Sequence, residues 1–104
     1  MTKLMSEIRV RFKDGSAVEE NKATETFIAA IRKIGVEKVH ALGIESMKHP
    51  LVTEERVMEK DAKFMQSPVD GYWVTHGQNV KGLCDILRKI SSRLGLDLKV
   101  DEIG

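Results

Sequence analysis

The chain has 104 residues, with 17 Lys and Arg against 16 Asp and Glu and a hydrophobic fraction of 41%. These values are typical of one soluble domain with a single core, and they exclude a uniformly basic or acidic protein. The only cysteine, Cys84, excludes an intramolecular disulfide and a cysteine-rich zinc framework.

We expect a single domain over residues 1–104 of a cytoplasmic protein of bacterial type. The N-terminal residues contain no apolar segment typical of a signal peptide, and no window approaches the roughly 18 apolar residues of a membrane span. Residues 1–5 are expected to form a disordered extension, and residues 45–70 an irregular connector.

Charge is unevenly divided along the chain. Residues 1–44 carry eight basic and six acidic side chains, residues 45–70 carry four and six, and residues 71–104 carry five and four. The near-neutral total is therefore a cancellation among segments. Because phosphate binding needs a basic face, a nucleic-acid surface has to come from segregation of charge within the two flanking parts.

Residues 7–20 predict a β-hairpin. Ile8, Val10 and Phe12 alternate with charged residues, which places three apolar side chains on one face of a strand. Asp14-Gly15-Ser16 is a turn signal between alternating segments, and residues 17–20 supply a second, short strand.

Two helices are predicted next. Asn21 or Thr24 caps the first, and Gly35 ends or bends it. The second is short and spans residues 36–42, with Gly43 as its stop. The apolar stripe of the first helix consists of Phe27, Ile28, Ile31 and Ile34.

Residues 45–70 lack sustained periodicity and contain both prolines of the chain. A connector of this length is either partly structured or functionally mobile. Three apolar pairs, Leu51-Val52, Val57-Met58 and Phe64-Met65, recur along it, and this recurrence favours a partly structured segment.

The last third predicts a strand, a helix and a strand. The strand at 72–75 follows the turn Asp70-Gly71, the helix spans about 79–94 up to Gly95, and alternating apolar residues at 96–100 form the last strand. If the two strands are neighbours in one sheet, the crossover makes them parallel. The sum is an α+β domain of order ββα, connector, βαβ, in which two main helices pack on one face of a small mixed sheet.

Two parts of the chain are candidate binding surfaces. Arg9, Arg11 and Lys13 share the outer face of the first strand, and further basic residues, Lys81 among them, lie on the last helix. The alternative for both is a solvated face whose charges form local ion pairs.

The segment 75–79 joins the end of a strand to the start of a helix, where free backbone N–H groups favour an anion. The alternative for this segment is a helix cap at Asn79. Trp73 is either covered by the connector or exposed for stacking on a base. The candidate nucleic-acid or anion ligands are Arg9, Arg11, Lys13, Trp73, Thr75, His76, Gln78, Asn79 and Lys81.

The sequence contains no recognisable catalytic constellation, metal-ligand set or cofactor motif. None of the three histidines has a second histidine four residues away. Cys84 falls in the apolar stripe of the last helix, which favours core packing over a pairing with His76. A site assembled across the fold, such as His76 with Glu54 or Glu55, is the enzyme alternative.

Several stretches of the sequence resemble a known type of module. They are residues 23–28, 31–35, 71–76 and 90–100, and the resemblance covers nearly the whole chain. They are similar to a small bacterial module of uncharacterised activity that forms C-terminal accessory domains of restriction or nuclease-type proteins. The resemblance implies an accessory role near nucleic acid or a partner protein, and it assigns no catalytic residue.

These patterns together predict a non-catalytic binding module whose partner is nucleic acid rather than a small molecule. Its surface combines Arg9, Arg11 and Lys13 with the segment 73–79. The alternative is a protein-interaction or self-association domain, such as a homodimer, which the near-neutral charge and the exposed edges of a small sheet permit.

Overall fold

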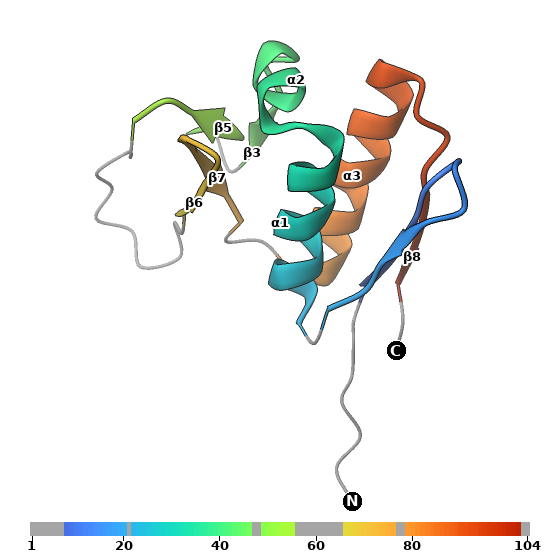
Figure 1. Cartoon of the computed structure of the whole chain (residues 1–104). Coiled ribbons are helices and arrows are strands. Elements are labelled where there is room, and N and C mark those ends of the chain that lie inside the picture. Colours follow the sequence, from blue (N-terminus) through green and yellow to red (C-terminus); the bar gives the residue numbers. More distant parts are fainter. Residues whose placement is uncertain (1–7, 21, 47–48, 56–65, 77–78, 103–104) are drawn as a thin grey trace, which may run out of the picture.

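Two main helices lie between two small sheets, as Figure 1 shows. The computed structural model describes residues 8–20, 22–46, 49–55, 66–76 and 79–102. In chain order the elements are β1 (Ile8–Arg11), β2 (Ala17–Val18), α1 (Ala23–Ile34), α2 (Val36–Ala41), β3 (Glu45–Ser46), β4 (His49–Pro50), β5 (Val52–Thr53), β6 (Gln66–Val69), β7 (Tyr72–Thr75), α3 (Val80–Leu94) and β8 (Lys99–Glu102). None of these helices is long and apolar enough to cross a membrane.

Every strand pairing among the described residues is antiparallel. Strands β2, β1 and β8 form sheet one in that order, and β5, β7 and β6 form sheet two, while β3 and β4 make a separate pair. The α+β class with two main helices is confirmed.

The hairpin between β1 and β2 follows the predicted pattern. Ile8 and Val10 are fully buried, whereas Arg9 and Arg11, which alternate with them, are exposed. The carboxylate of Asp14 accepts hydrogen bonds from both the backbone N–H and the hydroxyl of Ser16, at 2.8 and 2.6 Å. This local bonding holds the turn that directs β2 back along β1.

The start of α1 differs from the prediction. The N-cap residue is Lys22, whose side chain makes no capping hydrogen bond, and Thr24 lies inside the first turn, so a Thr24 cap is wrong. The other predicted cap, Asn21, lies outside the described residues. The hydroxyl of Thr26 accepts a hydrogen bond from the N–H of Glu20 at 2.8 Å and ties the preceding segment to the helix instead. Gly35 ends α1 as predicted, with φ of +112° that disfavours side chains.

The connector between α2 and β7 is partly structured, as the apolar pairs predicted. It contributes the β3 and β4 pair and the two outer strands of sheet two, and Leu51 and Val52 are buried. The other two apolar pairs lie outside the described residues. Asp70 and Gly71, both with positive φ, form a two-residue turn between β6 and β7, which suits the twist of a hairpin.

The single mixed sheet with a parallel strand pair is wrong, because β7 and β8 belong to different sheets. Strand β7 already has β5 on one edge and β6 on the other, so β8 finds no free edge there. The free edge of β1 is available instead, and β8 pairs with it so that Val10 lies opposite Val100. The helices consequently have a sheet on either side of them (Figure 1).

One continuous core joins the two sheets. Phe27 and Ile31 of α1, Leu87 of α3, Val10 of β1 and Val74 of β7 are all fully buried and belong to the same apolar cluster. The outer face of sheet one, which points away from this cluster, is therefore free to carry charged side chains.

Candidate nucleic-acid interface

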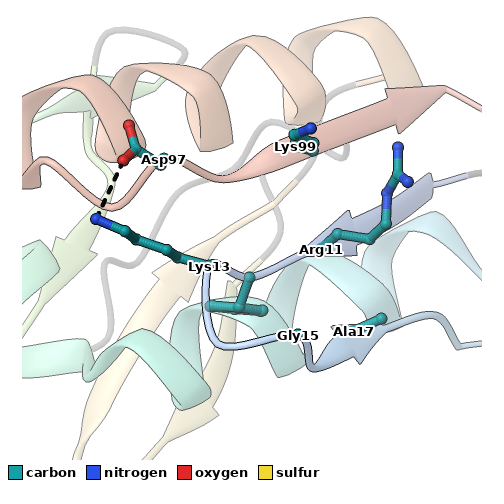
Figure 2. Close-up of a pocket in the computed structure, with 7 residues that line it drawn as sticks. Arg11, Lys13, Gly15, Ala17, Asp97 and Lys99 are labelled. Carbon is teal, nitrogen blue, oxygen red and sulfur yellow. Dashed lines mark ion pairs between the residues drawn. The ribbon is translucent and has the colours of Figure 1, made fainter.

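The outer face of sheet one gathers the basic residues of two strands. Arg9 and Arg11 of β1, Lys13 just beyond it and Lys99 of β8 are all exposed, and Lys99 lies directly opposite Arg11 in the sheet register. A concavity of about 420 Å³ opens among them (Figure 2). Its lining consists of Arg11, Phe12, Lys13, Gly15, Ala17, Asp97 and Lys99.

Carboxylates in β8 or close to β2 and β8 form ion pairs with the three cations that the sequence singled out. Arg9 bonds Glu19 at 2.7 Å, and Arg11 bonds Asp101 at 2.8 Å. The hydrogen bond and charge of Glu19 raise the pKa of Arg9. The Lys13 ammonium lies 3.6 Å from Asp97, and both side chains are about three-quarters exposed, at 77% and 73%. Exposed pairs of this kind are weak because water and salt screen them.

Lys99 differs from the other three cations. Within the described residues it makes no ion pair with a carboxylate. Figure 2 places it on β8 above the concavity, across from Lys13 and Arg11 on the first strand. The face thus combines one unpaired cation with two paired ones around a single hollow.

Asp97 is held in place by the chain reversal after α3. Gly95 and Asp97 both adopt positive φ, at +65° and +53°, and the N–H of Leu98 donates to the hydroxyl of Ser91 at 2.9 Å. Sequence reasoning missed Asp97 and Lys99 as parts of this face. Their alternation with apolar residues was visible, but nothing local signalled that their strand pairs with β1.

Trp73 and Thr75, from the second half of the predicted surface, lie in sheet two, apart from this face. Trp73 is half-buried in β7, and Thr75 beside the end of the strand is fully buried. The Thr75 hydroxyl donates to the carbonyl of Pro50 at 3.2 Å and accepts from the amide nitrogen of Gln66 at 3.3 Å. Thr75 therefore has a structural part in sheet two, and its hydroxyl does not face a ligand in solution.

His76 is also buried, with 7% of its surface exposed. Its Nε2 lies 2.7 Å from the hydroxyl oxygen of Ser67 on β6, and no hydrogen bond within the described residues joins it to Glu54 or Glu55. Burial lowers the pKa of His76, which favours the neutral imidazole. Gln78 lies outside the described residues.

Asn79 and Lys81 stand at the start of α3. The Asn79 side-chain oxygen accepts a hydrogen bond from the N–H of Gly82 at 2.8 Å, which confirms the helix cap at this residue. Lys81 lies 3.8 Å from Asp85, one turn further along the helix. Cys84 is fully buried, so core packing is confirmed for it, and burial raises the pKa of its thiol.

Replacing Asn79 with alanine is expected to lower the free energy of unfolding by about 1 kcal/mol, since one N–H of the first turn loses its acceptor. Asn79→Asp keeps the acceptor and adds a negative charge that the helix dipole favours, so stability should be retained. Urea unfolding followed by circular dichroism measures both changes. An aspartate variant as unstable as the alanine variant would contradict the capping role.

Among the described residues, no group of three or more His, Cys, Asp or Glu side chains is placed to hold a metal ion. Comparison with protein-family models, with curated protein sequences and with solved structures gave no significant match. The residues and geometry of the chain itself are therefore the basis for assigning a function.

Proposed function

We propose that this chain is a binding module for nucleic acid and that it contacts phosphates through the outer face of sheet one. The observation behind the proposal is that Lys99, which forms no ion pair with any described residue, lies beside Arg11 and Lys13 around the 420 Å³ concavity. A phosphate oxygen can replace an exposed carboxylate as the partner of Arg11 or Lys13, and it can pair with Lys99, which has no carboxylate partner in the described parts of the chain.

This proposal is narrower than the surface expected from the sequence. The segment 73–79 is left out because Trp73 and Thr75 lie in sheet two, beyond the helices. Without base-reading side chains on the face, the contacts are to the backbone of the nucleic acid, so binding should be weak and insensitive to base sequence.

The salt dependence of binding is the direct test. With three phosphate contacts, the slope of log K against log salt is about −3 on duplex DNA, and affinity falls roughly 40-fold between about 50 and about 200 mM salt. Fluorescence anisotropy with labelled duplex and single-stranded DNA measures this. No salt-sensitive binding at about 50 μM protein, a concentration typical of non-specific contacts, would overturn the proposal.

Two substitutions on the face should move the affinity in opposite directions. Lys99→Ala removes the unpaired cation and is expected to weaken binding and reduce the salt slope by about 1. Asp97→Asn removes a competing carboxylate, tolerates the positive φ at this position and should strengthen binding. Lys89→Ala, which removes an exposed lysine of α3, is the control and should change neither value.

Self-association through a sheet edge is the alternative function. β8 is an edge strand of sheet one, and a guanidinium nitrogen of Arg88 donates to its Val100 carbonyl at 2.9 Å. This bond occupies one of the backbone acceptors that a second strand would need. Sedimentation at increasing protein concentration separates the two functions: a dimer that does not bind DNA would favour the alternative.

A further inference from the structure

A second hollow lies between α1 and sheet two. It has a volume of about 490 Å³ and receives one residue, Ser67, from β6. The remaining lining comes from α1 and the segment before it: Glu20, Thr24, Glu25, Ile28, Ala29 and Arg32. This groove is separate from the concavity on sheet one, with which it shares no lining residue.

Ser67, which lines this groove, has its side chain against that of His76. The strand register pairs Ser67 with Val74, so His76, two residues further on, lies diagonally across on the same face of the sheet. The hydroxyl oxygen and Nε2 are 2.7 Å apart, within the range at which a base removes a proton from a nucleophile.

The tautomer of His76 suits a base. Burial favours the neutral imidazole, and we assign its one ring proton to Nδ1. Nε2 is then the acceptor for the Ser67 hydroxyl.

We propose that Ser67 is a nucleophile, activated by His76, that accepts an acyl group from an uncharged carboxylic ester bound in the groove beside α1. As the Ser67 oxygen forms its bond to the ester carbonyl carbon, the hydroxyl proton passes to Nε2 of His76. The same proton then goes to the leaving alkoxide as the ester C–O bond breaks. Water hydrolyses the resulting acyl-serine by the same route and releases the carboxylic acid.

The groove lining favours an uncharged acyl donor. Glu20 and Glu25 place two carboxylates around it, whereas Arg32, the one cation among its described lining residues, lies 3.9 Å from Asp70. An anionic ester is therefore repelled. Ile28 and Ala29 of α1 offer apolar contacts to a short acyl group.

The test uses a fluorophosphonate probe, which modifies activated serines, on the whole chain, with mass spectrometry to locate the label. Labelling is expected at Ser67 and should be lost in Ser67→Ala. His76→Gln retains a hydrogen-bond acceptor for Ser67 but cannot take up its proton, so it should slow labelling by about 100-fold or more. Ser16→Ala is the control: this hydroxyl bonds a carboxylate, and its removal should leave labelling at Ser67 unchanged.

The pH profile supplies a second readout that does not depend on a variant folding. Because the pKa of His76 is lowered from 6.5, Nε2 is free to accept a proton above pH 6.5. Labelling should therefore be level around neutrality and should fall only as the pH drops through the lowered pKa. A rate that rises in proportion to hydroxide, no label at Ser67, or equal labelling of folded His76→Gln would each overturn the proposal.

This inference is independent of the nucleic-acid proposal. Ser67→Ala should bind DNA as the unaltered chain does, and Lys99→Ala should be labelled at the unaltered rate. Turnover of p-nitrophenyl acetate, an uncharged ester, should decline with labelling in both Ser67→Ala and His76→Gln. Unchanged turnover in both variants would contradict an acyl-serine at this position.

Discussion

Replacing Phe27 with alanine is expected to lower the free energy of unfolding by about 3–5 kcal/mol. Phe27 lies on α1 with none of its surface exposed, within the apolar cluster that joins both sheets. Removing the ring leaves a cavity that packed neighbours fill only in part. Since a domain of this size is stable by roughly 5–15 kcal/mol in total, the variant should be close to unfolding at room temperature. Urea unfolding followed by circular dichroism measures the loss.

Phe12 provides the matched control for this substitution. Its ring is only partly buried at the end of the first hairpin strand, and the ammonium of Lys33 lies 5.1 Å from the ring centroid. Phe12→Ala loses part of the apolar burial and one cation–π contact, so it should destabilise clearly less than Phe27→Ala. Equal losses for the two variants would contradict the placement of the core between the helices and the sheets.

Thr75→Val is the second substitution with a large expected effect, about 1–3 kcal/mol of lost stability. The two side chains have nearly the same shape, so the change removes little more than the hydroxyl. That hydroxyl is the donor to the Pro50 carbonyl and an acceptor for the Gln66 amide, and the residue is fully buried. Valine removes the donor from the Pro50 carbonyl at a site that water cannot easily reach, and it takes one acceptor from the Gln66 amide, which keeps its bond to Thr53. Thermal and urea unfolding both report the loss.

Thr53→Val is the control for the hydroxyl. Thr53 donates to the Glu55 carbonyl at 2.6 Å in an exposed hydrogen bond, which water can replace, and it accepts from the Gln66 amide at 3.3 Å. Because Thr53 is only partly buried whereas Thr75 is fully buried, the loss of its hydroxyl should cost less. Neither variant should alter DNA binding, because both residues belong to sheet two. If Thr75→Val left stability unchanged and reduced DNA binding, Thr75 would have to be assigned to the binding surface after all.

Local patterns predicted most elements of this fold, although the last strand spans Lys99–Glu102 and not residues 96–100. The Asp14-Gly15-Ser16 turn, the stop at Gly35 and the cap at Asn79 each depend on a backbone conformation or hydrogen bond within a few residues. The alternation in β1 likewise specifies which side chains are buried, because successive side chains of a strand point to opposite faces. Thr24 was misassigned as a cap because several residues near the start of α1 can fulfil that function and the choice depends on packing.

The candidate site was predictable only in part. The alternation of side chains along the first strand predicted that Arg9, Arg11 and Lys13 point outward, and all three are exposed in the structure. Their carboxylate partners were not predictable: Arg11 and Asp101 are 90 residues apart in the sequence. Lys99 belongs to the face for the same reason, since only the pairing of β8 with β1 brings it opposite Arg11.

The hydrogen bond between Ser67 and His76 also depends on strand pairing that the sequence does not show. Neither residue stands in a nucleophile motif, and their approach depends on the β6 and β7 register that the Asp70-Gly71 turn sets. That turn is readable from the sequence, but the start of β6 and the covering of this face by α1 are not.

By itself, the sequence determined the elements with strong local signals, their buried faces and the α+β class, because turns, caps and side-chain periodicity are properties of neighbouring residues. Only the tertiary structure decided which strands share a sheet, since β7 has both edges occupied and β8 has to pair with β1. The strand pairing also determines which charged side chains meet. Of the 17 basic and 16 acidic residues, Arg9, Arg11 and Lys13 form ion pairs on the face of sheet one, whereas Lys99 has none among the described residues.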